Sequence, residues 1–449
     1  MALRVCGVLF RDLSVLSRRL VVSAPQESAS CFLTAGNAAC SRGRRNGFIF
    51  TPACFITSEA FLSRLIKGKA KADGSIDHLP ALVLSDNSEQ LSLLMRYPDQ
   101  PPDSKVLKVA IIGAPNAGKS TLSNQLLGRK VFAVSKKVHT TRSRALGVLT
   151  MNDTQIILLD TPGLTTLSKV KRHHLEKSLL VDPWNTVREA DLIVVMVDLS
   201  DRWTCNRLDF EVLKCLTEYS HIPAILVLNK VDLVKDKEKL LDITAQLTCG
   251  VVNGHKIRVR PVIKPPWADK RPERNLKVSL DEDASVAEDH GESGSVLSKE
   301  QLKDLSKQLG WSRFKDVFML SSVDKEDVDT LKSYFLVAAK PGPWRYHSEV
   351  LTDQSPEEVC TNTIREKLLE YLPQEVPYSI TQSVEVWQDG ENEQLDISVK
   401  LYITKESHMK MVIGKKGQMI AQIAKEASED LCQLYLREVR LKLSAKMKR

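Results

Sequence analysis

The sequence lacks the features that mark several large classes of protein. No uninterrupted apolar run reaches the roughly 18 residues that a membrane-spanning helix needs. The nine cysteines contain no C-x-x-C spacing, which argues against a zinc site and against a disulfide framework. No internal repeat is present. What remains is the composition of an ordinary soluble globular protein, whose 449 residues predict two or three domains.

The first 50 residues lack lysine and are poor in acids. They contain seven arginines and only two acidic residues, Asp12 and Glu27, and so supply +5 of the net charge of +8. Such an arginine-rich, serine-rich segment is typical of a mitochondrial transit peptide, which we predict over residues 1–45. A disordered basic tail without a targeting role is the alternative. Residues 46–105 follow as a linker with no assigned element.

Short apolar runs alternate with helical stretches from residue 106 onward. Strands that alternate with helices imply right-handed crossovers, and near-continuous apolar runs imply strands buried on both faces. We therefore predict an α/β domain over residues 106–338 with a doubly wound, mostly parallel sheet. Its expected strands are Val106–Ile112, Gln155–Leu159, Leu192–Val197, Ala224–Leu228 and Val317–Leu320.

Residues 250–302 interrupt this alternation. The stretch passes from basic and proline-containing sequence to acidic sequence, and then to glycine and serine. Such a composition cannot bury enough apolar surface to offset the entropy of ordering the chain. We predict an insertion that is partly disordered, and a binding arm is the alternative.

A glycine-rich segment follows the first expected strand and opens a helix expected over Ser120–Leu127, in which Thr121 also belongs to the expected nucleotide site. It matches G-x-x-x-x-G-K-[ST], the phosphate-binding loop. Glycines let backbone N–H groups face phosphates. Lys119 would place a cation on the β- and γ-phosphates, and the Ser120 hydroxyl would bind Mg²⁺. The segment consists of Gly113, Ala114, Pro115, Asn116, Ala117, Gly118, Lys119 and Ser120.

A second motif lies about 40 residues further along, at the end of an apolar strand. Asp160-Thr161-Pro162-Gly163 has the D-x-x-G pattern. Asp160 would hold Mg²⁺ through water, and the Gly163 N–H would reach the γ-phosphate. Ligands bind at the carboxyl edge of such a sheet, so these groups are expected to meet the phosphate loop.

Two later segments predict that the nucleotide is GTP or GDP. In Asn229-Lys230-Val231-Asp232, the Asp232 carboxylate can accept two hydrogen bonds from the N1–H and N2–H₂ edge of guanine, which adenine does not offer. We expect Asn229 to brace the loop and Lys230 to pack over the base. Ser321 and Ser322 follow another strand and can present a backbone N–H to guanine O6.

A second domain is predicted over residues 341–449, after a Pro-Gly-Pro hinge. Its pattern reads helix (Thr361–Leu372), strand (Tyr378–Trp387), strand (Leu395–Thr404), short helix, glycine loop, long helix (Gln418–Tyr435), strand (Arg437–Leu443), which suits an α+β type II KH domain. The second strand alternates between apolar and polar residues, so one of its faces should be buried. The glycine loop is flanked by isoleucines, and we expect its glycines to let RNA approach while the lysines meet phosphates. Residues 400–449 hold twelve Lys or Arg against five acids. The expected RNA-binding residues are Ile413, Gly414, Lys415, Lys416 and Gly417.

The motifs together resemble the GTPase group that contains Era, Der and the tRNA-modifying GTPase. The Pro115-Asn116 pair and Thr140-Thr141-Arg142 carry this resemblance. It implies that a threonine of the first switch completes the Mg²⁺ shell, which we expect to be Thr141, with Thr140 as the alternative. It also implies that Asn116 helps to hold K⁺ against the phosphates. Where many GTPases place a water-orienting Gln, this chain has Leu164, so we expect slow intrinsic hydrolysis. The catalytic candidates are Lys119, Asn116, Thr141 and Gly163.

One G domain followed by one KH domain is the architecture of the Era family. With the arginine-rich leader, the sequence is most similar to the mitochondrial members of that family. The resemblance implies binding near the 3′ end of mitochondrial small-subunit rRNA, help in assembling that subunit, and residence in the mitochondrial matrix. Bacterial members of the family associate loosely with membrane. The resemblance therefore also suggests peripheral contact with the matrix side of the inner membrane.

The expected mechanism is an RNA-assembly switch. GTP and Mg²⁺ would order the segments around Thr141 and Gly163, change how the two domains pack, and so open or close the RNA groove. Two alternatives remain: a GTPase acting in tRNA modification, and a structural RNA clamp that bound nucleotide only stabilises. No second catalytic constellation supports the former, while Leu164 keeps the latter open.

Overall fold

The computed structural model describes residues 3–5, 83–135, 145–161, 184, 186–201, 204–257, 298–373, 375–390 and 394–448. These residues belong to one compact unit. Nearly all of the predicted leader and the middle of the predicted insertion lie outside the described residues. Among the described helices, none is long and apolar enough to cross a membrane.

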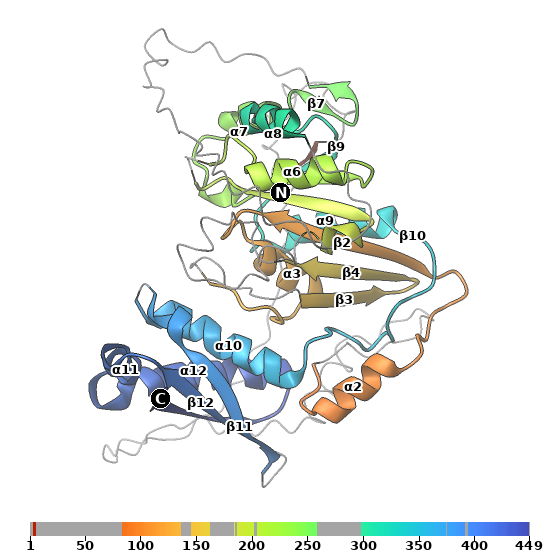
Figure 1. Cartoon of the computed structure of the whole chain (residues 1–449). Helices are drawn as coiled ribbons and strands as arrows, with labels where there is room; N and C mark the ends of the chain where they lie inside the picture. The colour runs from red at the N-terminus through yellow and green to blue at the C-terminus, as the bar shows by residue number, and fades with distance from the viewer. Residues whose placement is uncertain are drawn as a thin grey trace, which may run out of the picture. The chain divides into compact units, whose positions relative to one another are not determined.

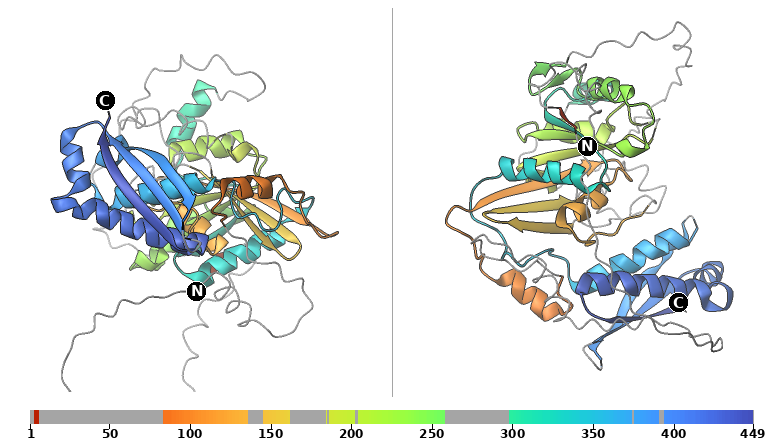
Figure 2. Two further views of the ribbon diagram at one scale, coloured as in Figure 1. Left: turned by 90° about the horizontal axis from the view of Figure 1, so that it is seen from below. Right: turned by 180° about the vertical axis from the view of Figure 1, so that it is seen from behind.

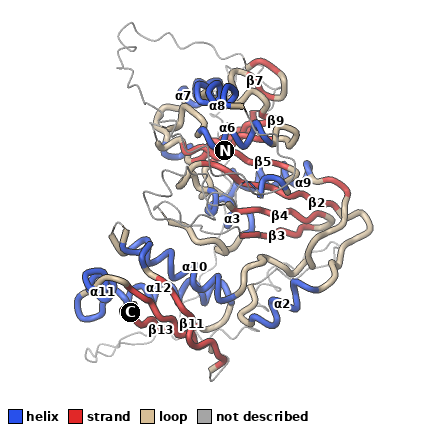
Figure 3. The backbone as a smooth tube through the Cα atoms, viewed as in Figure 1, coloured by secondary structure: helices blue, strands red, loops and turns tan. Residues whose placement is uncertain are grey.

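The first domain is built on one twisted sheet in which strands and helices alternate along the chain (Figures 1 and 3). The strand order is β1-β9-β6-β5-β2-β4-β3, and β10 also pairs with β2. All neighbours from β9 to β4 are parallel, whereas β1, β3 and β10 pair antiparallel. The bounds are β1 Leu3–Val5, β2 Lys105–Gly113, β3 Ala145–Met151, β4 Thr154–Asp160, β5 Leu192–Asp198, β6 Ala224–Asn229, β9 Phe314–Leu320 and β10 Lys340–Pro341.

Both faces of this sheet are buried, which explains the near-continuous apolar runs. Along β2, Val109 and Ile111 face one core, while Ala110 and Ile112 face the other. The first core takes residues from α3 (Lys119–Leu127) and α9 (Lys325–Ala338). The second takes residues from α6 (Phe210–Glu218), α7 (Glu238–Leu247) and α8 (Lys299–Lys307). The predicted doubly wound sheet and its five expected strands are confirmed.

Ordered structure reaches into both ends of the predicted insertion. Val251–Val252 (β7) and His255–Lys256 (β8) form a hairpin whose turn residues, Asn253 and Gly254, both have positive φ. Ser298 starts α8 with a capping box, so that helix begins before the predicted end of the insertion at residue 302. Residues 258–297 lie outside the described residues, so disorder there stays a prediction.

The second domain is a three-stranded sheet covered by helices on one face (Figure 2). The β11–β12 pair is antiparallel and the β12–β13 pair is parallel. Alternate residues of β12 from Leu395 to Ile403 are buried against α10 and α12, as predicted. In chain order the elements are α10 Pro356–Tyr371, η2 Val376–Ser379, β11 Thr381–Asp389, β12 Leu395–Ile403, α11 Glu406–Ile413, η4 Lys415–Gly417, α12 Gln418–Tyr435 and β13 Val439–Met447. This is the type II KH order, which confirms the predicted fold class.

Several predicted boundaries in this domain were wrong. The last strand, expected at Arg437–Leu443, runs over Val439–Met447. The first helix, expected at Thr361–Leu372, begins at Pro356, because Ser355 and Glu358 form a capping box and proline suits the first turn. The first strand, expected from Tyr378, begins at Thr381, because Val376–Ser379 form a 3₁₀ turn.

The segment that joins the domains also differs from expectation. Residues 344–353 were predicted as part of the second domain, yet they form hydrogen bonds to β3 and β4 and to Gln90, Asp99 and Gln100. The Val148 N–H donates to the Leu351 carbonyl at 2.8 Å, and Gly147 bridges Thr352. The linker is therefore hydrogen-bonded to the edge of β3 before α10 begins.

A helix also lies where the sequence predicted only a linker. Helix α2 (Asn87–Met95) is capped by Asp86, and its Gln90 amide donates to the Thr352 carbonyl at 2.8 Å. Just before it, the Ser85 carbonyl accepts from the Trp387 indole at 2.9 Å. Residues 83–95 thus bind both the joining segment and the second domain.

Candidate functional site: a nucleotide loop and an RNA loop

The phosphate loop turns through backbone conformations that require its glycines. Gly113 and Gly118 have φ of +153° and +99°. A Cβ at Gly113 would meet the Met196 carbonyl oxygen at 2.4 Å, and one at Gly118 would meet the Asn229 amide nitrogen at 2.2 Å. Neither neighbour can move away cheaply, because one is backbone and the other braces the loop.

Lys119 lies buried inside this loop at the start of α3. Its ammonium donates to the carbonyl oxygens of Gly113 at 3.3 Å and Ala114 at 3.0 Å. Burial lowers the pKa of Lys119 to about 8, and the neighbouring Asp160 carboxylate opposes that shift. A cation held across the loop in this way is placed to meet phosphate oxygens.

The two predicted Mg²⁺ ligands lie together. The Ser120 hydroxyl donates to the Asp160 carboxylate at 2.7 Å, and Asp160 is fully buried at the end of β4. Mg²⁺ binds through hydroxyl and carboxylate oxygens together with waters and substrate phosphates, so this pair fits the ion. Next to it, the Thr161 hydroxyl donates to the Ile111 carbonyl at 2.7 Å and ties the end of β4 to β2.

Asn229 links the end of β6 to two other loops. Its amide donates to the Ala117 carbonyl at 2.7 Å, and its oxygen accepts from the N–H of Ser322 at 2.9 Å. Because these contacts use both ends of the amide, Asn229 positions the loops around it. Asp232, three residues further on, is exposed and can accept hydrogen bonds from a base.

The two serines after β9 already donate their N–H groups within the protein. The Ser321 N–H donates to Asp327 at 2.9 Å, and the Ser322 N–H donates to Asn229. Contact of either N–H with guanine O6 therefore stays a prediction. It requires that the N–H be shared between O6 and its present acceptor.

Asp198 belongs to this site although sequence reasoning missed it. Its carboxylate pairs with the Lys230 ammonium at 2.6 Å, and the same ammonium donates to the Asn116 carbonyl at 3.0 Å. Lys230 therefore joins the end of β5, the end of β6 and the phosphate loop. An acid at the last position of an apolar strand was the available signal, but only the parallel pairing of β5 with β6 brings Asp198 to Lys230.

Part of the predicted site cannot be located. Thr140, Thr141 and Arg142 lie outside the described residues, as do Gly163 and Leu164. The expected third metal ligand and the γ-phosphate contact therefore stay predictions.

The RNA loop connects α11 to α12 through three residues with positive φ. They are Gly414 (+70°), Lys416 (+51°) and Gly417 (+81°). A Cβ at Gly414 would lie 2.6 Å from the Met419 Cβ, whereas Gly417 has open space. Packing as well as backbone conformation therefore excludes larger residues at Gly414.

Side chains of this loop are presented to solvent. Lys415 and Lys416 are exposed, and Ile413 remains 37% exposed, which is unusual for isoleucine in an ordered domain. Ile423, one turn into α12, is instead fully buried. An apolar side chain beside two cations and a tight backbone turn can meet both the bases and the phosphates of a single strand.

The guanine-binding motif at residues 229–232 is hydrogen-bonded to the phosphate loop at the edge of a doubly wound sheet. This arrangement defines the first domain as a P-loop GTPase. The second domain is a KH module. Comparisons with known proteins agree: residues 108–230 match the family described as 50S ribosome-binding GTPase, and residues 375–449 match the KH domain family.

Relatives match the whole chain. "GTPase Era, mitochondrial" from Salmo salar is 66% identical, and that from Danio rerio is 55% identical, each over 100% of both chains. The crystal structure of Era in complex with MgGDPNP and nucleotides 1506–1542 of 16S ribosomal RNA is 26% identical, with a TM-score of 0.55. It covers 77% of this chain and 94% of its own. This chain belongs to the mitochondrial Era GTPase family and is a GTPase.

Proposed function

We propose that this GTPase is an RNA chaperone. It binds mitochondrial small-subunit rRNA near its 3′ end through the KH domain and assists assembly of the small ribosomal subunit. The observation that carries the proposal is the solvent-facing Gly414–Gly417 loop in a chain that also holds a guanine-type site. An Era structure similar over 77% of this chain was solved with MgGDPNP and a 16S rRNA segment, which supports the choice of ligand.

In this proposal each loop of the nucleotide site has its own role. Backbone N–H groups of residues 113–121 bind the phosphates, except at Pro115, which has no N–H. Lys119 neutralises the phosphates, and Asp232 selects guanine. Ser120 would hold Mg²⁺ directly and Asp160 through water, and Thr141 would complete the shell. When bound, Mg²⁺ offsets charge on the β- and γ-phosphates. Gly163 would sense the γ-phosphate.

Hydrolysis is proposed to be slow without help, because Leu164 cannot orient water as a glutamine does. Asn116 is the candidate residue for holding a potassium ion at the phosphates. It lies in the loop with φ of +64°. Turnover measured in matched K⁺ and Na⁺ buffers tests this, and equal rates would remove potassium from the proposal.

The proposed cellular site is the mitochondrial matrix, with the leader over residues 1–45 and peripheral contact with the inner membrane. Tagged full-length protein should enter mitochondria, whereas residues 46–449 alone should not. Release of the imported protein from mitochondrial membranes by alkaline carbonate would support peripheral contact. Recovery in the soluble fraction throughout would exclude it.

Cross-linking in cells followed by sequencing of bound RNA tests the central proposal. Wild type should give a peak near the 3′ end of mitochondrial small-subunit rRNA, and Lys415→Asp with Lys416→Asp should lose it. Lys307→Asp, in an exposed pair with Asp304, is a matched charge control that should keep the peak. Peaks on tRNA, or a peak indifferent to the KH substitutions, would contradict the assigned RNA or site.

A further inference from the structure

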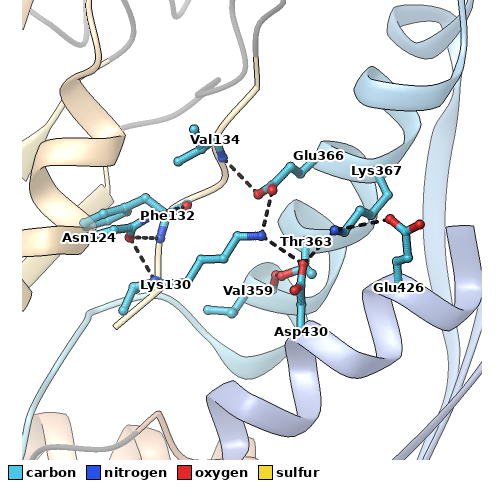
Figure 4. Close-up of polar contacts among 11 residues, drawn as sticks. Asn124, Lys130, Phe132, Val134, Val359, Thr363, Glu366, Lys367, Glu426 and Asp430 are labelled. Carbon is cyan, nitrogen blue, oxygen red and sulfur yellow. Dashed lines mark hydrogen bonds and ion pairs between the residues drawn. The ribbon is translucent and has the colours of Figure 1, made fainter. Parts of the chain in front are cut away.

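The phosphate loop and the RNA loop are each continued by a helix. Helix α3 starts at Lys119, directly after Gly118, and α12 starts at Gln418, directly after Gly417. At about 1.5 Å per residue, Asn124 lies roughly one and a half turns into α3, and Asp430 lies about 18 Å along α12. Asp430 belongs to a cluster of charged side chains, and Asn124 binds the backbone next to Lys130 of that cluster (Figure 4).

On the G-domain side, Asn124 holds the segment that follows α3. Its oxygen accepts from the N–H groups of Val131 and Phe132 at 2.9 and 2.8 Å, and its amide donates to the Phe132 carbonyl at 2.8 Å. Three bonds from one side chain fix this backbone to α3. The same segment carries Lys130 and Val134.

On the KH side, Glu366 of α10 binds both Lys130 and Val134. Its carboxylate accepts from the Val134 N–H at 2.9 Å and pairs with the Lys130 ammonium at 2.7 Å. Lys130 also pairs with Asp430 of α12 at 2.8 Å. The Glu366 side chain is only 8% exposed, so these bonds are poorly replaced by water.

The cluster continues inside the KH domain. Lys367 pairs with Asp430 at 3.1 Å and with Glu426 at 3.5 Å, and the Tyr371 hydroxyl donates to Glu426. Lys367 and Glu426 lie on α10 and α12, so a shift of either helix against the other changes these distances. The ion-pair distances in this cluster therefore depend on the position of α12 relative to α10 and on the position of the G domain.

We propose that Glu366 and Lys130 are positioning residues through which the nucleotide on the phosphate loop sets the affinity of the RNA loop. The inference rests on the proposed function and specifies its regulation. Displacement of α3 moves residues 130–134 through Asn124, and these residues pull on Glu366 and Asp430. The coupling is reciprocal, because a coupling free energy acts equally on both ligands.

Other contacts of the join are less suited to this role. Gln155, Thr352 and Asp353 bind the linker to β3 and β4, which are buried strands of the rigid sheet. They hold the domains together without touching a helix that begins at either functional loop. Glu366 touches a segment held by one such helix, and Lys130 joins it to the other.

The test measures RNA affinity of the full-length protein in the MgGDPNP and MgGDP states. The probe is an RNA with the sequence of nucleotides 1506–1542 of 16S rRNA, followed by fluorescence anisotropy. Wild type should show a ratio of affinities of at least about fivefold between the two states. Glu366→Gln and Lys130→Met should bring this ratio to within about twofold of one. In wild type, RNA should shift the ratio of MgGDPNP affinity to MgGDP affinity by the same factor, and Glu366→Gln should abolish that shift.

Two controls separate coupling from folding. Lys130→Arg keeps the charge and should keep the ratio, and Lys307→Met removes an exposed ion pair of the G domain and should leave it unchanged. An unchanged ratio in Glu366→Gln and Lys130→Met would overturn the proposal. So would affinities that fall equally in both states, which is the mark of a merely structural contact. A wild-type ratio of one with intact RNA binding and hydrolysis overturns the relay alone, whereas absent RNA binding overturns the proposed function as well.

Discussion

Lys119 illustrates how a single side chain can link nucleotide binding to pH. Its pKa of about 8 lies below the ordinary 10.5 because burial disfavours the charged form. Between these values the unfolded chain holds a proton that the folded protein has released. Folding is therefore disfavoured by the buried charge below pH 8, and stability rises as pH increases from 8 toward 10.5.

A phosphate beside Lys119 favours the charged form, so GDP binding should take up a proton above pH 8. We expect GDP affinity to fall by roughly tenfold between pH 8 and 9.5, since each unit above the pKa costs up to a factor of ten. Calorimetry in two buffers of different ionisation enthalpy at pH 9 measures the proton uptake. In Lys119→Arg the guanidinium stays charged, and the pH dependence should vanish even if binding weakens. An equal fall in that variant would assign the effect to another group.

Among the elements, the two glycines of the RNA loop make different demands. Both have positive φ, but only Gly414 packs against a neighbour, the Met419 Cβ on the first turn of α12. A side chain at Gly414 must therefore move the start of α12, whereas one at Gly417 pays only the backbone cost of about 1–2 kcal/mol. The conformation of the loop at Gly414 and the position of the first turn of α12 are therefore coupled.

Gly414→Ala should weaken RNA binding more than Gly417→Ala does, by roughly tenfold, because only the former displaces α12. Anisotropy with the RNA probe named above measures both variants, and thermal unfolding checks that each is folded. Gly417→Asn is a useful third variant, because asparagine adopts positive φ more readily than alanine. Equal losses in the two alanine variants would show that neither the Met419 contact nor the ψ of −174° at Gly414 adds to the loss of RNA affinity.

At the scale of the whole molecule, one buried side chain holds the start of the joining segment. Gln155 of β4 is fully buried, and its oxygen accepts from the N–H groups of Arg345 and Tyr346 at 2.9 and 3.1 Å. Its amide donates to the Tyr346 carbonyl at 2.8 Å. A polar residue inside an otherwise apolar strand thus binds the chain that leads to the second domain.

Gln155→Leu should lower the free energy of unfolding by about 2–4 kcal/mol, because it leaves part-buried backbone groups of the linker without partners. Denaturant unfolding measures the loss, and Gln388→Leu, on the exposed part of β11, is the matched control that should stay within about 0.5 kcal/mol of wild type. A Gln155→Leu protein as stable as the control would mean that the linker is held elsewhere.

The sequence by itself determined the class of both domains and most of the nucleotide and RNA loops. Each of these features depends on a short run of residues: apolar runs define buried strands, and the glycines at 113, 118, 414 and 417 define turns that few other residues can make. Such signals are local because they report the backbone conformation of contiguous residues. For the same reason the helix at residues 87–95 went unrecognised, since its buried Leu93 packs against residues of β3, β4 and the joining segment that are distant in sequence.

Tertiary structure alone decided which distant side chains meet. Asp198 reaches Lys230 because β5 and β6 are parallel neighbours, and Lys130 reaches Glu366 and Asp430 because the linker binds the edge of β3. In sequence these residues are ordinary surface charges, as most lysines and acids are. An ion pair depends on separation in space, and separation in space is set by strand order and domain packing, which no local pattern encodes.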